Sequence, residues 1–352
     1  MSAVSLAACG VNNDSGPAKP RKGDDITVGV LLPEVARFQE FDYPAIKSQV
    51  LSLTHGKGKV LYANAGADAA RQSRQVDQMI ADKVDVLLVG TVADSMFIAA
   101  DIKRAKDAGI PVIAYDRLPP GPIDAYISFD KAFVGQMQGQ ALLYALGSRA
   151  GSSKVVMMNG QAGDPNAVLY KQGALGVLKG NVNVAESYDV PAWSQDIAKK
   201  DMEQAVRAIG VGNIAGVIAA NDYMAGSAID AMKEAGAVKL PPVIGQSADL
   251  AAVQRIVSGD QYMSVYRSYQ QEAADAAQMA VAKAQGGTIE FDSLTRDKVD
   301  SPTQKNIPSM LLQGVEITKD NIKDTVVHDG VYTVQQICTA KYEADCAAVG
   351  LK

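Results

Sequence analysis

The chain has 352 residues, more than one ordinary hydrophobic core accommodates, so we expect two domains. Hydrophobic residues make up 47% of the sequence and charged residues 21%, which is the balance of a globular protein. The net charge is −5 with acidic and basic residues interspersed, which argues against a nucleic-acid partner, and no apolar run reaches the roughly 18 residues that cross a bilayer.

The first residues resemble a lipid-attachment site. The run Leu-Ala-Ala directly precedes Cys9, and small residues before a cysteine are typical of the cleavage site of bacterial lipoprotein leaders. Residues 10–25 are rich in Gly, Asn, Asp, Ser, Pro and Lys, which predicts a flexible tether. We expect residues 1–25 to form a lipoprotein leader and tether with the lipid on Cys9. A chance match is the alternative, because no basic residue precedes the apolar run.

From residue 26 onward, short apolar segments alternate with helical patterns. The segment 27–32 is a continuous apolar run, as in a strand buried on both faces of a parallel sheet. We expect strands at 27–32, 59–63, 85–89 and 111–115, and helices at 42–54, 68–82 and 94–108. The rhythm then repeats, with strands at 154–158, 182–188, 216–219 and 242–244 and helices at 166–178, 194–209 and 222–235. The predicted fold class is α/β, with two doubly wound parallel-sheet lobes.

Polar side chains follow several of the expected strands directly. They are Asp116 and Arg117 after 111–115, Asn221 after 216–219, Ser247 after 242–244 and Arg267 after 261–266. Because doubly wound sheets bind ligands at the carboxyl ends of their strands, these side chains mark a candidate site in both lobes. A surface ion pair is the alternative for Asp116 and Arg117.

Cys338 and Cys346 lie near the C-terminus with seven residues between them. A closed loop of this size suits a disulfide, which would contribute ~2–3 kcal/mol to stability. Because disulfides persist in oxidising compartments, this pair favours a location outside the cytoplasm. Two free thiols are the alternative.

The sequence offers little material for catalysis or metal binding. Its two histidines, His55 and His328, both lie in polar, turn-like surroundings. It contains neither a Gly-x-Ser-x-Gly nucleophile motif nor a Gly-rich phosphate-binding loop ending in Lys-Ser or Lys-Thr. We therefore expect no enzyme activity, no cofactor and no metal site.

Several stretches carry a resemblance to a known family. They are Ala-Tyr-Asp-Arg at 114–117, Tyr-Ile-Ser-Phe-Asp at 126–130, Ala-Asn-Asp at 220–222 with Ala-Gly at 225–226, Gly-Gln at 245–246 with Ala-Asp-Leu at 248–250, and Asn-Ile-Lys-Asp-Thr-Val at 321–326. Over residues 26–334 the chain resembles the D-xylose-binding proteins of bacterial ATP-binding-cassette importers, within the ribose/galactose-type periplasmic binding proteins.

The resemblance implies the type I periplasmic binding protein fold, in which a three-strand hinge joins the two lobes. The chain is expected to cross the hinge near Asp130, Tyr266 and Pro302. The expected domains are an N-terminal lobe of residues 26–129 plus 267–302, a C-terminal lobe of residues 130–266 plus 303–335, and a tail of residues 336–352 that carries the disulfide.

The resemblance also implies a sugar site in the cleft between the lobes. The implied residues are Arg37, Phe38, Asp116, Arg117, Asn166, Trp193 and Asn221. Carboxylate, amide and guanidinium groups suit sugar hydroxyls, and flat aromatic rings cover the C–H faces of a pyranose. Trp193 is the only tryptophan. Its neighbours, Pro-Ala before it and Ser-Gln after it, are typical of a loop, which favours a site role over the alternative of a core residue.

The candidate site departs from the family pattern at two positions. Ser247 stands where the family has an acidic residue, and Arg267 stands where it has a lysine. The first change removes an acceptor for two adjacent hydroxyls, and the second replaces a point donor by a planar fork. The ligand is therefore expected to be a xylose-like pentose, or a related hexose or polyol.

The expected function is that of an extracytoplasmic solute-binding protein, lipid-anchored to the outer face of the cell membrane. The protein, a monomer, would close like a hinge around a monosaccharide and deliver it to the permease of an ATP-binding-cassette importer. The alternative is a sugar-sensing receptor that presents the bound sugar to a signalling partner.

Overall fold

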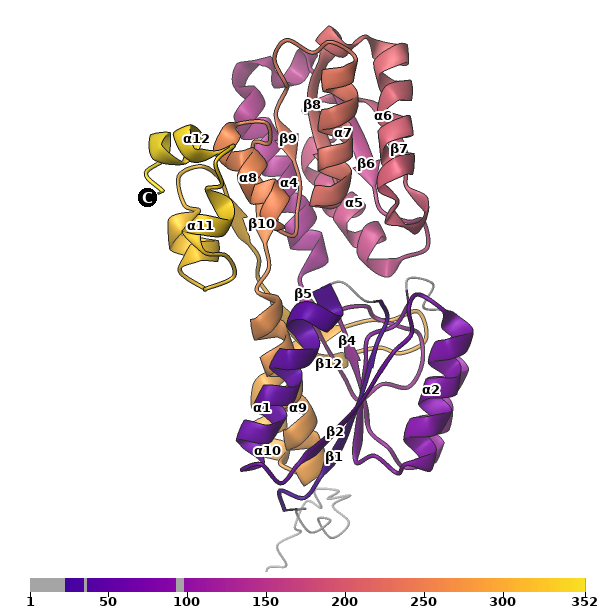
Figure 1. The fold of residues 1–352 in the computed structure, drawn as a ribbon. Coiled ribbons are helices and arrows are strands. Elements are labelled where there is room, and N and C mark those ends of the chain that lie inside the picture. Colours follow the sequence, from indigo (N-terminus) through magenta and orange to yellow (C-terminus); the bar gives the residue numbers. More distant parts are fainter. Residues whose placement is uncertain (1–22, 35–36, 93–97, 352) are drawn as a thin grey trace, which may run out of the picture.

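The computed structural model describes residues 23–34, 37–92 and 98–351. Over these residues the chain forms two lobes, each built on a parallel sheet and linked to the other by several passes of the chain (Figure 1). No helix within these ranges is long and apolar enough to cross a membrane. Cys9, the expected site of the lipid, lies outside the described residues.

The N-terminal lobe contains a seven-stranded sheet in the order β11-β12-β5-β4-β3-β1-β2. Its strands are β1 (Thr27–Leu32), β2 (Lys59–Asn64), β3 (Val86–Val89), β4 (Val112–Tyr115), β5 (Ala125–Phe129), β11 (Asp297–Val299) and β12 (Ile307–Leu312). All neighbours pair in parallel except β11 and β12. Strands β3, β4 and β5 are buried throughout, because helices cover both faces of the sheet.

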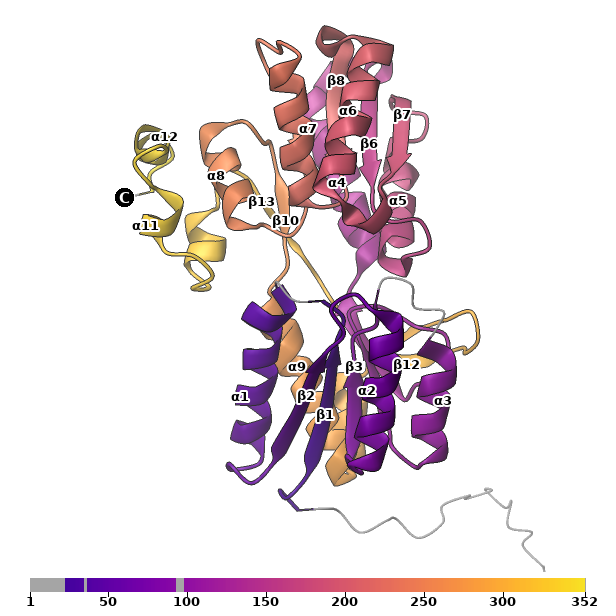
Figure 2. The same cartoon turned by 45° about the vertical axis from the view of Figure 1, so that its right-hand side comes forward.

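Two separate apolar cores hold these helices to the sheet. The helices α1 (Tyr43–Leu53), α9 (Tyr269–Gln285) and α10 (Thr288–Leu294) cover one face, and α2 (Ala69–Ala81) and α3 (Ala99–Asp107) cover the other (Figure 2). Ile46 of α1 and Ala277 of α9 belong to the first core, and Val76 of α2 and Ile102 of α3 to the second. Helix α9 therefore returns to the N-terminal lobe although it follows most of the C-terminal lobe in the sequence.

The C-terminal lobe repeats this plan on a smaller sheet in the order β7-β6-β8-β9. Its strands are β6 (Lys154–Asn159), β7 (Asn183–Asp189), β8 (Ile214–Ala219) and β9 (Val243–Ile244), all in parallel. Helices α4 (Lys131–Leu146) and α5 (Pro165–Leu178) cover one face, and α6 (Gln195–Ile209) and α7 (Asp222–Glu234) cover the other. Helix α8 (Leu250–Ser258) leads into β10 (Ser264–Tyr266), which pairs antiparallel with β13 (Val315–Ile317).

Glycines let α4 and α5 cross in close contact. A Cβ atom on Gly135 would lie 2.2 Å from the carbonyl oxygen of Tyr170, and one on Gly173 would lie 2.0 Å from that of Ala132. Because no real Cβ atom approaches an oxygen so closely, both positions require glycine. This crossing fixes the two helices whose N-termini face the other lobe (Figure 1).

The chain passes between the lobes after β5, after β10 and after β12. The first two crossings lie next to Asp130 and Tyr266, where the sequence places them. The third lies later than the sequence predicts, because β12 pairs in parallel with β5 of the N-terminal sheet. Residues 303–312 therefore belong with the N-terminal lobe, and the chain crosses between Leu312 and Val315 instead of near Pro302. Local sequence does not reveal this difference, since a short apolar strand carries no mark of the sheet it joins.

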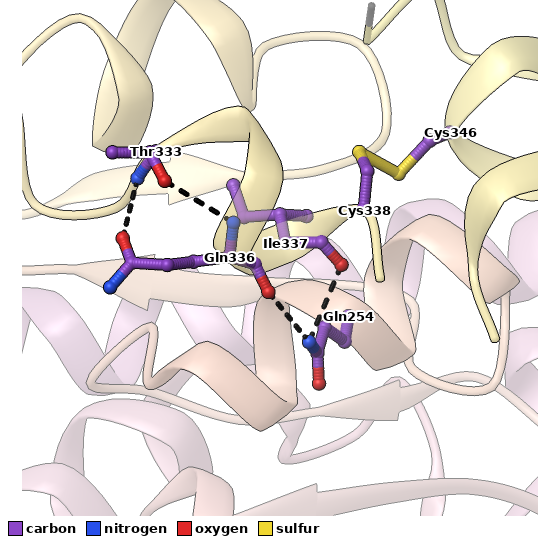
Figure 3. Close-up of a disulfide and its surroundings, with 6 residues drawn as sticks. All are labelled: Gln254, Thr333, Gln336, Ile337, Cys338 and Cys346. Atoms are coloured by element: carbon purple, nitrogen blue, oxygen red, sulfur yellow. Dashed lines mark hydrogen bonds between the residues drawn. A yellow bond between two sulfur atoms is a disulfide. The ribbon is translucent and has the colours of Figure 1, made fainter. Parts of the chain in front are cut away.

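The C-terminal residues form a small unit against α8. It contains a short π-helix at Lys323–Val327 and the helices α11 (Val334–Ile337) and α12 (Glu343–Ala348). The disulfide Cys338–Cys346, with 5.8 Å between the Cα atoms, joins the two helices, and the side chain of Gln254 on α8 donates to the carbonyl oxygens of Gln336 and Ile337 (Figure 3). The unit is thus closed by one covalent link and is fixed to the C-terminal lobe by apolar packing and hydrogen bonds.

Replacing both cysteines by serine is expected to lower the free energy of unfolding by ~2–3 kcal/mol, because the bond restricts the unfolded chain across a short loop. Urea denaturation of the double variant measures the loss. The wild type in the presence of a reductant is the matched control and should show the same loss. An unchanged midpoint in both samples would contradict a stabilising disulfide.

Candidate ligand-binding site

The carboxyl ends of the parallel strands in each lobe point toward the other lobe, and the loops that follow them meet there (Figure 1). Contacts across the gap join the loop after β4 in the N-terminal lobe to the start of α5 in the C-terminal lobe. Nδ2 of Asn166 lies 3.4 Å from Oδ2 of Asp116, and Nε of Arg117 donates to Oδ2 of Asp164 at 3.0 Å. The predicted strand-end residues therefore come together between the lobes.

Asp116 lies at the centre of this region and is 5% exposed. Nζ of Lys131 donates to its Oδ1 at 2.5 Å, and the guanidinium groups of Arg37 and Arg267 lie at 3.5 Å and 3.8 Å. Burial alone would raise the pKa of Asp116, but these cations outweigh it and hold the pKa well below its usual range. The carboxylate is therefore ionised at any physiological pH.

The backbone at Asp116 is strained, with a φ of 62° in the left-handed region that non-glycine residues rarely occupy. The hydroxyls of Tyr126 and Ser128, on the neighbouring strand β5, donate to the Asp116 carbonyl oxygen at 3.0 Å and 2.9 Å. These two bonds hold the turn in place, so that the carboxylate projects between the lobes.

Arg37 follows β1 and contacts three carboxylates. Its Nη2 atom lies 3.4 Å from Asp42, 3.5 Å from Asp116 and 3.7 Å from Glu272. Phe38, implied as a sugar-stacking ring, lies instead in the core of the N-terminal lobe, 5% exposed and edge-on to Tyr115. The guanidinium carbon of Arg37 lies 4.3 Å from the ring centre of Phe38, so this ring packs against Arg37 on one side and the core on the other.

Arg267 follows β10 and is 5% exposed. Its Nη2 donates to the hydroxyl of Tyr269 at 3.2 Å, and its guanidinium carbon lies 5.4 Å from the ring centre of Phe129. Ser247 lines the same small pocket of about 20 Å³ as Arg267, and its φ of 114° is again in a strained region. The departures from the family pattern thus lie side by side.

Trp193 ends a short helical turn after β7, and its ring lies against Gly160. A Cβ atom at position 160 would lie 2.2–2.5 Å from three atoms of the six-membered ring, so only glycine allows the indole to lie there. The indole Nε1 donates to Oδ2 of Asp164 at 3.2 Å. The side chain is partly buried and has contact with the apolar core on both faces of the C-terminal sheet.

Asn221 closely follows β8 and caps the next helix. Its Oδ1 accepts from the backbone N–H of Met224 at 2.9 Å and caps helix α7. This side chain thus has a local role at the start of α7, and it follows β8 at the carboxyl edge of the C-terminal sheet.

Several buried polar atoms around Asp116 make no hydrogen bond within the part of the chain that the structure describes. Among the described residues, the buried polar atoms without a hydrogen bond include Arg37 Nη2, Asp42 Oδ2, Asn166 Oδ1, Arg267 Nε and Nη1, and Glu272 Oε1 and Oε2. Buried donors and acceptors are costly when unpaired, so such a group marks a place where a polar ligand gains hydrogen bonds on entering.

The structure adds charged residues that the sequence did not single out. They are Glu34, Asp42, Lys131, Asp164 and Glu272. One feature of the sequence could have indicated Lys131. This residue occupies the first turn of α4, where the helix dipole disfavours a cation, so a lysine there suggests a nearby negative partner. The carboxylates give no such signal, since Asp and Glu are common near helix N-termini.

Glu272→Gln is expected to make stability less dependent on pH. Burial, with the charge of Asp116, raises the pKa of Glu272 from 4.5 to about 7. Between these values the unfolded chain releases a proton that the folded protein keeps, so the wild-type free energy of unfolding falls as the pH rises, by about 3 kcal/mol from this group.

Glutamine does not titrate, so this loss is absent from the variant. The free energy of unfolding of Glu272→Gln should therefore rise relative to that of the wild type between about pH 4 and pH 8. Urea denaturation at both ends of this range measures the difference, with Glu343→Gln on exposed α12 as control. Parallel pH profiles for all three proteins would contradict a protonated Glu272.

A model of the periplasmic binding protein domain matches residues 44–288. The D-xylose-binding periplasmic protein of Escherichia coli is 34% identical over 285 residues, which cover 79% of this chain and 83% of that protein. The chain belongs to the periplasmic binding protein family. This membership confirms the predicted fold class and the resemblance on which the site was built, and it makes the chain a binding protein of the extracytoplasmic space instead of an enzyme.

Other family members match over nearly the whole chain. A multiple sugar-binding periplasmic receptor of Rhizobium radiobacter is 27% identical, with 96% of this chain and 99% of that protein covered. The structure of an ABC transporter solute-binding protein from Clostridium phytofermentans, with bound β-D-glucose, superposes with a TM-score of 0.79 at 25% identity, covering 88% of this chain and 99% of that one.

Proposed function

We propose that this periplasmic binding protein captures a monosaccharide between its lobes and delivers it to the permease of an ATP-binding-cassette importer. The observation that carries the proposal is the cluster around Asp116. One ionised carboxylate, surrounded by three cations, lies beside an amide and other unpartnered polar atoms at the meeting point of the two sheets. This mixture of charged donors and acceptors suits a ring of hydroxyl groups.

Each side chain has a distinct part in the proposed site. Asp116 accepts hydrogen bonds from two hydroxyls while its cations keep it ionised. Arg267 and Asn166 supply buried atoms that make no hydrogen bond with the described residues of the chain. Trp193 covers one C–H face of the sugar with its indole.

The family relatives support a neutral monosaccharide as the ligand class. Those named above bind D-xylose, several sugars or β-D-glucose. Ser247 lacks the carboxylate of the xylose-type pattern and Arg267 adds planar donors beside it, so we infer that the ligand is a xylose-like pentose or a related hexose or polyol.

Delivery requires that the permease distinguish the loaded protein from the empty one. The three passes of the chain between the lobes form a hinge, and a sugar that touches both lobes stabilises the closed form. We further propose that a lipid on Cys9 anchors the protein beside its permease. Loss of labelling by a fatty acid in Cys9→Ser cells would support the anchor, and equal labelling of both proteins would argue against it.

A thermal-shift screen of pentoses, hexoses and polyols tests the proposed function. A ligand at 100 times its Kd stabilises the folded state by ~2.7 kcal/mol, which raises the melting temperature by several degrees. At least one monosaccharide should produce this shift in the wild type. A panel in which no sugar or polyol shifts the melting temperature would refute the proposal.

A further inference from the structure

The carboxylate of Asp164 contacts three residues of the candidate site. Asp164 is fully buried at the N-terminus of α5, and its Oδ1 accepts from the backbone N–H of Asn166 at 2.9 Å. Its Oδ2 accepts from Nε of Arg117 at 3.0 Å and from Nε1 of Trp193 at 3.2 Å. Asn166 and Trp193 belong to the same lobe as Asp164, whereas Arg117 comes from the other lobe.

The other end of Arg117 is held by its own lobe. Its Nη1 donates to Oε1 of Glu34 at 3.1 Å and to the carbonyl oxygen of Thr91 at 3.1 Å. These partners lie in the loops after β1 and β3, so the guanidinium is fixed on the N-terminal lobe and reaches the C-terminal lobe through Nε. The family resemblance implies Arg117 as a sugar ligand, but two of its three guanidinium nitrogen atoms, Nε and Nη1, already donate hydrogen bonds within the chain.

A contact between lobes exists only while the lobes are closed. When the hinge opens, Arg117 and Asp164 separate and water solvates both charges. In the closed form the pair is nearly dry, with side chains 10% and 0% exposed, and a charge-assisted bond is stronger there than in water. The pair thus favours the closed form independently of the ligand.

We propose that Asp164 is a positioning residue that latches the two lobes through Arg117 and sets the orientation of Trp193. This inference deepens the proposed function and rests on it for the sugar-binding readout. Its structural part can be tested without any ligand, because the latch and the indole bond are both present in the chain alone.

Asp164→Asn is the test variant. Asparagine is as good an N-cap as aspartate, so α5 and the bond to the N–H of Asn166 are retained while the charge is removed. The ligand-free variant should have a larger radius of gyration by small-angle scattering than the wild type. The emission of Trp193, the only tryptophan, should shift to longer wavelength because the indole loses its charged acceptor and becomes more accessible to water.

Two further variants complete the experiment. Asp107→Asn removes a carboxylate from the C-terminal end of α3, which lies at the edge of the sheet away from the other lobe, and should leave scattering and emission as in the wild type. Arg117→Met removes the other half of the latch and should open the protein to the same degree, and combining it with Asp164→Asn should add nothing to the opening.

In the sugar titration, Asp164→Asn should raise the Kd about tenfold or more, since opening the latch lowers the population of the binding-competent form. Unchanged scattering and emission in Asp164→Asn, or effects of the two latch variants that simply add, would overturn the inference. If the wild type binds no sugar while the ligand-free differences are present, the proposed function fails and the latch stands.

Discussion

Replacing Asp116 by asparagine is expected to weaken sugar binding and to destabilise the protein at the same time. The carboxylate lies 2.5 Å from Nζ of Lys131, a side chain that is 1% exposed, and two further guanidinium groups lie within 4 Å. Removing the negative charge leaves Lys131 buried without a counter-ion. Breaking a buried pair in this way costs about 3–5 kcal/mol of stability.

The loss of binding has a separate cause. A neutral amide accepts weaker hydrogen bonds than a carboxylate and turns one acceptor into a donor, so sugar hydroxyls in a water-poor cleft lose their partners. The expected cost is ~1.5–3 kcal/mol, or roughly tenfold to hundredfold in Kd. Titration calorimetry measures the Kd, and urea denaturation without ligand measures the stability.

The double variant Asp116→Asn with Lys131→Met separates the two effects. Methionine has the length of the lysine stem without its charge, so the unpaired buried cation disappears and most of the lost stability should return. Sugar binding should remain weak, because the carboxylate is still missing. Full recovery of affinity in the double variant would show that Asp116 matters only as the partner of Lys131.

The second large effect is expected at Trp193. Trp193→Ala should weaken sugar binding by about 3–4 kcal/mol, several hundredfold in Kd, because the indole supplies the apolar surface for one face of the sugar. Its truncation should cost the empty protein only about 1–2 kcal/mol, since the side chain is partly buried. A tryptophan that served only the core would give the reverse: a loss of ~3–5 kcal/mol in stability with unchanged affinity.

Gly160→Ala tests the orientation of the indole without removing it. The added methyl group would collide with the six-membered ring, so the ring must leave its present position. The variant should lose affinity nearly as Trp193→Ala does, whereas Gly176→Ala, on α5 where a Cβ atom meets no neighbour, should bind sugar as the wild type does. Normal affinity in Gly160→Ala would exclude the stacked orientation.

The elements of this fold could largely be predicted from the sequence, because their signals are local. The apolar run of β1 and the capping residue Ser194 before α6 are visible in the sequence, and each marks an element within a residue or two of its observed bounds. The partner sheet of β12 is not a local property. It depends on β5, which lies far earlier in the chain, and the third crossing was therefore placed too early.

The candidate site was likewise predicted where the signals are local and missed where they depend on tertiary packing. Strand-end position and family resemblance together indicated Asp116 and Arg267, which the structure brings within 3.8 Å of each other. Lys131 and Glu272 were missed because charged residues in the first turn of a helix usually face solvent, whereas tertiary packing buries both of these side chains. The ring of Phe38 lies in the core because the helical turn after β1 directs it toward Tyr115, which a sequence pattern cannot specify.

Titration calorimetry of the wild-type protein with the sugar that gives the largest thermal shift tests the central claim most directly. The account predicts saturable binding of one monosaccharide per chain, and a Kd roughly tenfold to hundredfold higher when the same sugar is titrated into the variant with Asp116→Asn and Lys131→Met. Equal heats and equal Kd values for the two proteins would place the ligand elsewhere, and absence of binding by the wild type to every pentose, hexose and polyol tried would contradict the account as a whole.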